Sequence, residues 1–152
     1  MRIAFDLDNT LIRDIFPFPL EPPPQNKILR LLLRYERLRK NTIQLMELLQ
    51  QNDHEIWIYT SSLRSPVSIR MLFWLYGISL NGVVNKDIHQ KYVKIPCTKY
   101  PPAFGIDVLI DDSHGIENEG KIFNFKVIRI SPQNVNWYLK VKQQIQAQED
   151  KQ

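Results

Sequence analysis

Short apolar runs of strand length alternate along this chain with polar or amphipathic segments. The runs are rich in Ile, Val and Phe, and polar or turn-forming residues bound them. Such runs are typical of strands buried on both faces of a parallel sheet. We therefore predict strands at residues 2–5, 55–60, 82–85, 108–112 and 125–130.

Helical patterns occupy much of the chain between these runs. An apolar stripe of Ile28, Leu31, Leu32 and Tyr35 predicts a helix over 27–39. Further helices are predicted over 42–49, over 66–76, and from residue 133 into a tail that frays over 146–152. The helix over 66–76 begins at Ser65-Pro66 and ends before Gly77, which are favourable residues for a helix start and a helix end.

Strands that alternate with helices predict a parallel sheet with helices on both faces. Because crossovers between parallel strands are right-handed, we expect a doubly wound α/β fold with three layers, α/β/α. The 152 residues suit one domain spanning 1–152, and the intervals between strands leave no room for a large cap domain.

A segment rich in proline and phenylalanine, 13–25, follows the first strand. Pro22-Pro23-Pro24 is extended and incompatible with a helix. A loop of this length is often a lid over a site. The alternative is a passive connector that packs Phe16 and Phe18 on the core.

Composition narrows the class of protein. The formal charge of +4 favours an anionic ligand, and it supports nucleic-acid binding only weakly. Cys97 is the only cysteine, so no internal disulfide can form. No apolar run approaches the length of a membrane span, and the chain opens on a strand instead of a signal peptide. We expect a cytoplasmic protein with no membrane contact.

Polar residues stand where three of the predicted strands end. Asp6 and Asp8 follow the first strand, Thr60-Ser61-Ser62 follows the second, and Asp111-Asp112-Ser113 closes the fourth. Ligands of open α/β sheets bind outside the carboxyl ends of the strands. Each group alone could simply cap a helix or a turn. Their joint occurrence on one sheet predicts a site, and converging carboxylates need a cation or a shared proton.

The chemistry that these residues fit is phosphoryl transfer to a carboxylate. An aspartate nucleophile divides a difficult hydrolysis into two displacements, and oxygen-only ligands favour Mg²⁺. A lysine is also required near the phosphoryl group. Lys99 is the favoured candidate because Pro101-Pro102 restricts the chain between it and the acids, and Lys94 is the alternative.

These residues resemble the motifs of the haloacid dehalogenase superfamily of phosphatases. The motifs match in order: DLDNT at 6–10, IYTS at 58–61, a lysine at 99, and IDD at 110–112. The resemblance covers residues 2 to about 130. It implies that Asp6 is the nucleophile, that Asp8 is the general acid and base, and that Thr60 and Lys99 hold the phosphoryl group. It also implies Mg²⁺ bound by Asp6, the Asp8 carbonyl, Asp111 and Asp112.

Because it leaves no room for a cap domain, the chain resembles the magnesium-dependent phosphatases of that superfamily. The run TSSLRSP, similar to a segment of those proteins, indicates Arg64 as a further substrate contact beside Ser61 and Asn9. The expected function is a magnesium-dependent phosphatase acting on a phosphorylated substrate that the sequence does not identify. Alternatives are a phosphatase for nucleotides or nucleic-acid ends, and a non-catalytic protein that binds an acidic partner through the basic segment 27–40.

Overall fold

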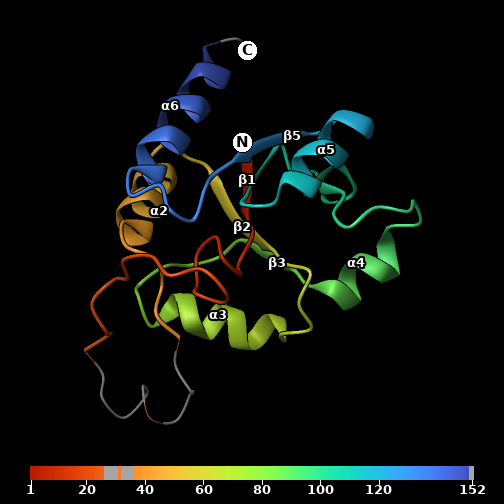
Figure 1. The fold of residues 1–152 in the computed structure, drawn as a ribbon. Coiled ribbons are helices and arrows are strands. Elements are labelled where there is room, and N and C mark those ends of the chain that lie inside the picture. Colours follow the sequence, from red (N-terminus) through yellow and green to blue (C-terminus); the bar gives the residue numbers. More distant parts are fainter. Residues whose placement is uncertain (26–30, 32–35, 151–152) are drawn as a thin grey trace.

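The structure, a computed structural model, describes residues 1–25, 31 and 36–150. Five parallel strands form one sheet in the order β3-β2-β1-β4-β5 (Figure 1). The strands are β1 Arg2–Phe5, β2 Glu55–Tyr59, β3 Gly82–Val84, β4 Val108–Asp111 and β5 Lys126–Arg129. The central strand β1 pairs with β2 and β4, which places Ile3 opposite Ile56 on one side and Val108 on the other.

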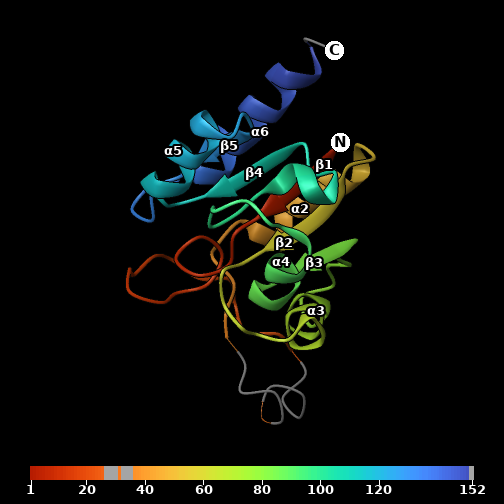
Figure 2. The same ribbon diagram turned by 90° about the vertical axis from the view of Figure 1, so that its right-hand side faces the viewer.

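Alternate residues of the strands face two layers of helices. Ile3 and Phe5 lie in a core shared with α2 (Thr42–Gln51), α3 (Pro66–Trp74) and α6 (Trp137–Glu149). Ala4 faces the other way, toward Ile116 of α5 (His114–Ile122) and Ile88 of α4 (Lys86–Tyr92). In Figure 1 the strands lie between α2 and α6 on the left and α4 and α5 on the right, and Figure 2 views the sheet from the side of α4 and α5. The predicted doubly wound α/β fold with three layers is confirmed, and the described residues contain no large cap domain.

The helix boundaries follow local capping. The Ser65 hydroxyl accepts a hydrogen bond from the Ser68 amide at the start of α3, and Gly77 takes a positive φ of 77° just beyond its end. The short helix α4 had not been predicted, although Asn85 caps it in the usual way. Helix α6 begins at Trp137 and continues through Glu149, so the residues 146–149 of the expected frayed tail are helical. No helix in the described part of the chain is long and apolar enough to cross a membrane.

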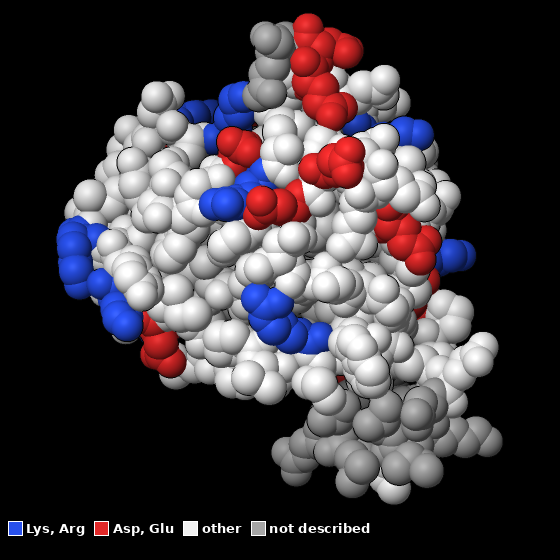
Figure 3. All heavy atoms as spheres, turned by 180° about the vertical axis from the view of Figure 1, so that it is seen from behind, with Lys and Arg blue, Asp and Glu red and all other residues white. Residues whose placement is uncertain are grey.

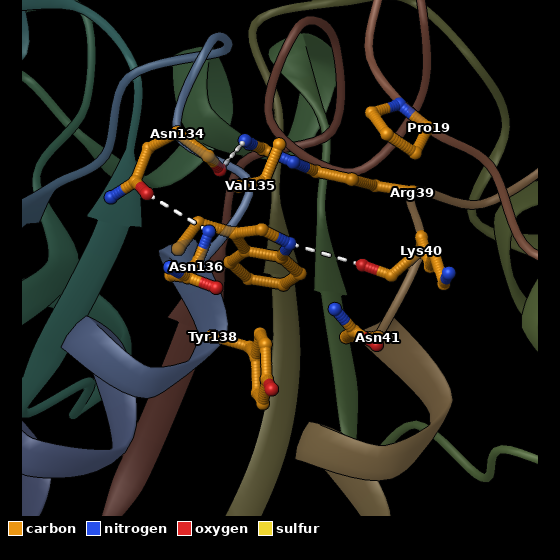
Figure 4. A pocket seen from close by; sticks show the side chains of 9 residues that line it. Pro19, Arg39, Lys40, Asn41, Asn134, Val135, Asn136 and Tyr138 are labelled. Carbon is orange, nitrogen blue, oxygen red and sulfur yellow. Dashed lines mark hydrogen bonds between the residues drawn. The ribbon is translucent and has the colours of Figure 1, made fainter.

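The helix predicted over 27–39 lies mostly outside the described residues, but its last part is wrong. Leu38 bridges to Ile12 and Arg39 bridges to Leu20, both in antiparallel fashion. Arg39 is 2% exposed, and its guanidinium donates to the carbonyls of Thr10, Ser131, Pro132 and Asn134. Figure 4 shows the bond to Asn134. These tertiary bonds satisfy a buried cation, and they outweigh the local preference for helix.

The proline-rich segment contributes both packed and exposed side chains. Phe18 is 4% exposed and lies against the Arg39 guanidinium, 4.7 Å from ring centroid to Cζ. The Glu21 carboxylate accepts a hydrogen bond from the Ile43 amide near the start of α2. Ile15 and Phe16 remain exposed. Packing of Phe18 agrees with the connector alternative for this residue, and a role of the segment as a lid stays a prediction.

Candidate active site

The three polar strand ends meet at the carboxyl edge of the sheet. The Asp6 amide continues the β1 ladder by donating to the Ile110 carbonyl at 2.8 Å. Thr60 does the same beyond β2, where its amide donates to the Val84 carbonyl at 2.9 Å. Asp111 is the last residue of β4. The backbone ladders therefore bring these residues from distant parts of the chain to one edge, as parallel pairing requires.

Lys99 lies between two of the acids. Its Nζ is 2.5 Å from Asp6 Oδ1 and 2.7 Å from Asp111 Oδ2, and the residue is 2% exposed. The competing candidate, Lys94, is exposed and donates to the Gln90 carbonyl. Of the two lysines considered from the sequence, only Lys99 contacts the acids.

Burial and mutual charge govern protonation here. Burial raises the pKa of Asp6 to about 7, and the Asp111 charge adds to this increase while Lys99 opposes it. Burial also raises the pKa of Asp112, with Asp111 as the next cause. Burial alone would lower the pKa of Lys99, but Asp6 and Asp111 raise it overall, so its ammonium stays charged. The site holds an excess of negative charge that one lysine does not fully balance.

Thr10 is a further residue of the site that was not among the predicted site residues. Its hydroxyl oxygen lies 3.3 Å from Asp6 Oδ2 and 3.1 Å from Asp112 Oδ1. Its carbonyl accepts a hydrogen bond from Arg39 Nη1 at 3.3 Å. Thr10 therefore links the acids to the buried guanidinium. The signal was present in the sequence, because Thr10 closes the DLDNT motif.

Three carboxylates are close enough to share one cation. Asp6, Asp111 and Asp112 can each offer an oxygen within 4.8 Å of the other two. An all-oxygen donor set of this kind suits Mg²⁺. The residues present therefore fit the expected ion. A contribution from the Asp8 carbonyl stays a prediction.

The Asp8 side chain turns to a different partner. It makes a short ion pair with Arg64 Nη1, and Arg64 Nη2 is 2.9 Å from Glu36 Oε1. Arg64 was expected to contact substrate directly. In this structure the carboxylates of Asp8 and Glu36 bind its guanidinium instead. The partner Glu36 had no distinguishing signal in the sequence.

The other expected substrate contacts lie around the acids. Ser61 lines a hollow of about 240 Å³ together with Asp6, Asp8, Lys99, Asp111 and Asp112. Thr60 is buried, and its hydroxyl accepts a hydrogen bond from the Ser62 amide at 3.1 Å. Asn9 Oδ1 accepts from the amides of Ile15 and Phe16, which orders the start of the proline-rich segment. Ser61 thus borders the hollow, whereas Asn9 holds a loop beside it.

Glu119 of α5 positions the lysine segment. Its carboxylate accepts hydrogen bonds from the Thr98 amide at 2.9 Å, the Thr98 hydroxyl at 2.7 Å and the Lys99 amide at 3.2 Å. No spacing of residues along the chain would reveal this contact. It fixes the backbone from which the Lys99 side chain reaches the acids.

The basic residues form no single stripe on the face shown in Figure 3. Lys and Arg side chains form separate groups there, with Asp and Glu between them. The positive net charge is therefore distributed over this face. A continuous track for a long polyanion is not evident on it.

Comparisons with known proteins add evidence on the fold. No family model matches the chain, and no curated protein does. A solved structure described as "Structure of Pnkp1/Rnl/Hen1 complex" matches with a TM-score of 0.56 at 12% identity, over 85% of this chain and 45% of that chain. Another, "Structure of the Pnkp1/Rnl/Hen1 RNA repair complex", matches with a TM-score of 0.54 at 10% identity, over 85% and 42%.

The chain thus spans less than half of each matched chain. At these identities the likeness is one of fold. Fold and geometry together define a doubly wound α/β protein with a lysine-bridged acidic site at the carboxyl edge of its sheet.

Proposed function

We propose that this protein is a phosphatase of the haloacid dehalogenase type that hydrolyses phosphomonoesters with Mg²⁺. One observation carries the proposal: the buried Lys99 ammonium lies between Asp6 and Asp111 at the sheet edge, with Asp112 close by. A buried acidic cluster with its own cation costs folding free energy, which is characteristic of functional sites. A protein that only bound an acidic partner would have no use for this arrangement.

The proposed reaction has two displacements. An Asp6 carboxylate oxygen attacks phosphorus and forms an acyl-phosphate bond, while the bond from phosphorus to the leaving oxygen breaks. Asp8 donates a proton to that oxygen. Asp8 then takes a proton from water, whose oxygen attacks phosphorus, so that phosphate departs and the Asp6 carboxylate is restored. Asp8 is the candidate for both proton transfers because it lines the hollow beside Asp6.

The remaining residues stabilise charge. Lys99 is placed to orient the Asp6 carboxylate and to meet the equatorial phosphoryl oxygens. Asp6, Asp111 and Asp112 would hold Mg²⁺, which when bound supplies positive charge for the approach of one anion to another. The Thr10 hydroxyl lies within hydrogen-bonding distance of the Asp6 and Asp112 carboxylates and helps to orient them.

Replacement of Asp6 by Asn tests the proposal. The neutral amide cannot form the acyl-phosphate, so turnover of a phosphomonoester panel with Mg²⁺ should fall by more than about a thousandfold. The panel should contain phosphorylated metabolites, nucleotides and phosphopeptides. Asp14→Asn, at an exposed acid of the proline-rich segment, is the matched control and should keep wild-type turnover. Near-normal turnover by the Asp6 variant would exclude the covalent mechanism.

A phosphatase for nucleic-acid ends is a narrower candidate. It is supported by the fold likeness to chains of a structure described as an RNA repair complex. The openness of the site agrees with it, because no cap covers the acids among the described residues. Comparison of an end-phosphorylated oligonucleotide with the matching mononucleotide measures how far a polymer improves kcat/KM. Equal values would favour the broader assignment.

A further inference from the structure

A second hollow adjoins the acidic site. It encloses about 410 Å³ and shares two wall residues, Ser61 and Thr98, with the hollow that contains the acids. Small-molecule sites have volumes of about 300 to 1,000 Å³. The rest of its wall comes from Thr60, which follows β2, and from α4 and the segment after it, with Lys86, His89, Gln90, Val93, Ile95 and Cys97.

Hydrogen bonds make the wall of this hollow a preformed surface. His89 Nε2 lies 3.1 Å from the Cys97 carbonyl, which can only accept, so the proton is on Nε2. His89 Nδ1 therefore accepts from the Tyr59 hydroxyl at 2.5 Å, and that hydroxyl accepts in turn from the Tyr100 amide at 2.9 Å. Burial lowers the pKa of His89, in agreement with a neutral ring. The imidazole thus joins β2, α4 and the chain on both sides of Lys99.

The first residue of α4 is also tied to the site. The Lys86 amide donates to the Ser62 carbonyl at 3.0 Å, next to the shared wall residue Ser61. Lys86 and Gln90 are exposed residues of the wall and can meet a polar ligand edge. Val93, which is 8% exposed, and Ile95 supply apolar contact area. The hollow combines apolar wall atoms with an amide and a cation at its opening.

We propose that this hollow binds the leaving group of the substrate and selects a nucleoside-sized ring system. The proposal rests on the phosphatase function, because the hollow acquires this task only if phosphoryl transfer occurs at Asp6. A nucleoside offers flat apolar faces for Val93 and Ile95 and hydrogen-bonding edges for Gln90 and Lys86. A linear polyol offers no such faces. Nucleoside monophosphates are therefore the substrate class that the wall fits best.

The test compares two substrates on the wild type and three variants. Adenosine monophosphate carries a ring system, whereas glycerol 3-phosphate has the same phosphomonoester on a small polyol. Gln90→Trp fills the opening of the hollow, and Lys91→Trp places the same side chain on the next residue of α4, outside the hollow. Lys86→Ala, a deletion instead of an insertion, provides a second test with little risk to folding. Binding of free adenosine is measured in parallel by titration.

In the wild type, kcat/KM should be at least about tenfold higher for adenosine monophosphate than for glycerol 3-phosphate. Gln90→Trp should abolish this preference and weaken adenosine binding about tenfold. Lys86→Ala should reduce the preference, and Lys91→Trp should behave as wild type. Equal turnover of both substrates by every variant would overturn the leaving-group site and leave the phosphatase function intact. Absence of turnover of any phosphomonoester would overturn both.

Discussion

At the scale of single residues, one ammonium joins the parts of the candidate site. Lys99 contacts acids at the carboxyl ends of two different strands, and Glu119 fixes its backbone. Asp6 could be identified from sequence because it directly follows an apolar run. The choice between Lys99 and Lys94 depended on where a loop crosses the sheet edge. Only the folded chain supplies that information.

Alanine replacement of the two lysines should have very different effects. A preorganised charge beside the transferring phosphoryl group contributes about 3 kcal/mol to transition-state stabilisation. Lys99→Ala should therefore lower kcat by roughly a hundredfold. Lys94→Ala should leave it within a few fold, since that exposed side chain bonds only a helix carbonyl among its described contacts. Both variants should be assayed at saturating Mg²⁺, so that a weakened metal site is not mistaken for a lost phosphate contact.

At the scale of elements, burial decided which predictions succeeded. The five strands could be predicted because their apolar residues are buried by helices on both faces. Residues 36–39 were misassigned because Leu38 and Arg39 bond to residues far away in sequence. Helix α4 was missed because it buries none of its residues, so no apolar stripe reveals it.

The two phenylalanines of the proline-rich segment should separate packing from ligand contact. Phe18→Ala should lower the free energy of unfolding by about 3 kcal/mol, because it removes a buried ring and leaves a cavity beside Arg39. Phe16→Ala should change it by less than about 0.5 kcal/mol, because that ring is 40% exposed. Urea unfolding of both variants measures the difference. Equal losses would mean that the whole segment is part of the core.

At the scale of the whole molecule, the acidic cluster should make the free energy of unfolding depend on the concentration of metal ion. Asp6, Asp111 and Asp112 concentrate negative charge in the folded state alone, so an ion bound there stabilises folding. At a hundred times its Kd, Mg²⁺ should raise the free energy of unfolding by about 2.7 kcal/mol. Thermal melts with Mg²⁺, with Zn²⁺ and after chelation measure the effect.

Mg²⁺ should raise the melting temperature and restore activity lost on chelation, whereas Zn²⁺ should not support activity. Asp112→Asn should reduce the thermal shift. Full activity after exhaustive chelation would remove the ion from the proposed mechanism.

The contribution of His54 to stability should fall as the solution is acidified. Burial lowers the pKa of His54 below its usual 6.5, and the chain's terminal ammonium adds to this effect. At this ring the unfolded chain binds more protons near pH 6 than the folded protein, so His54 by itself makes the free energy of unfolding decrease as pH falls below 7, whereas the raised pKa of Asp6 acts in the opposite direction. Urea unfolding of the wild type and of His54→Gln at pH 7 and pH 5.5 isolates the His54 contribution, because the wild type should lose more stability, or gain less, than the variant between the two pH values. An NMR titration of the His54 ring gives its pKa directly.

The sheet order has a consequence for how the molecule forms. The earliest strand in the chain, β1, lies at the centre and stays unpaired until β2 and β4 exist. During synthesis its two edges therefore wait for residues near 55 and 108, which is a contact pattern of long sequence separation that slows folding. The acids of the site face the same delay, because Asp6 meets Asp111 only through that pairing. A nascent chain that stops before β4 has an incomplete sheet and lacks Asp111 and Asp112 of the candidate site.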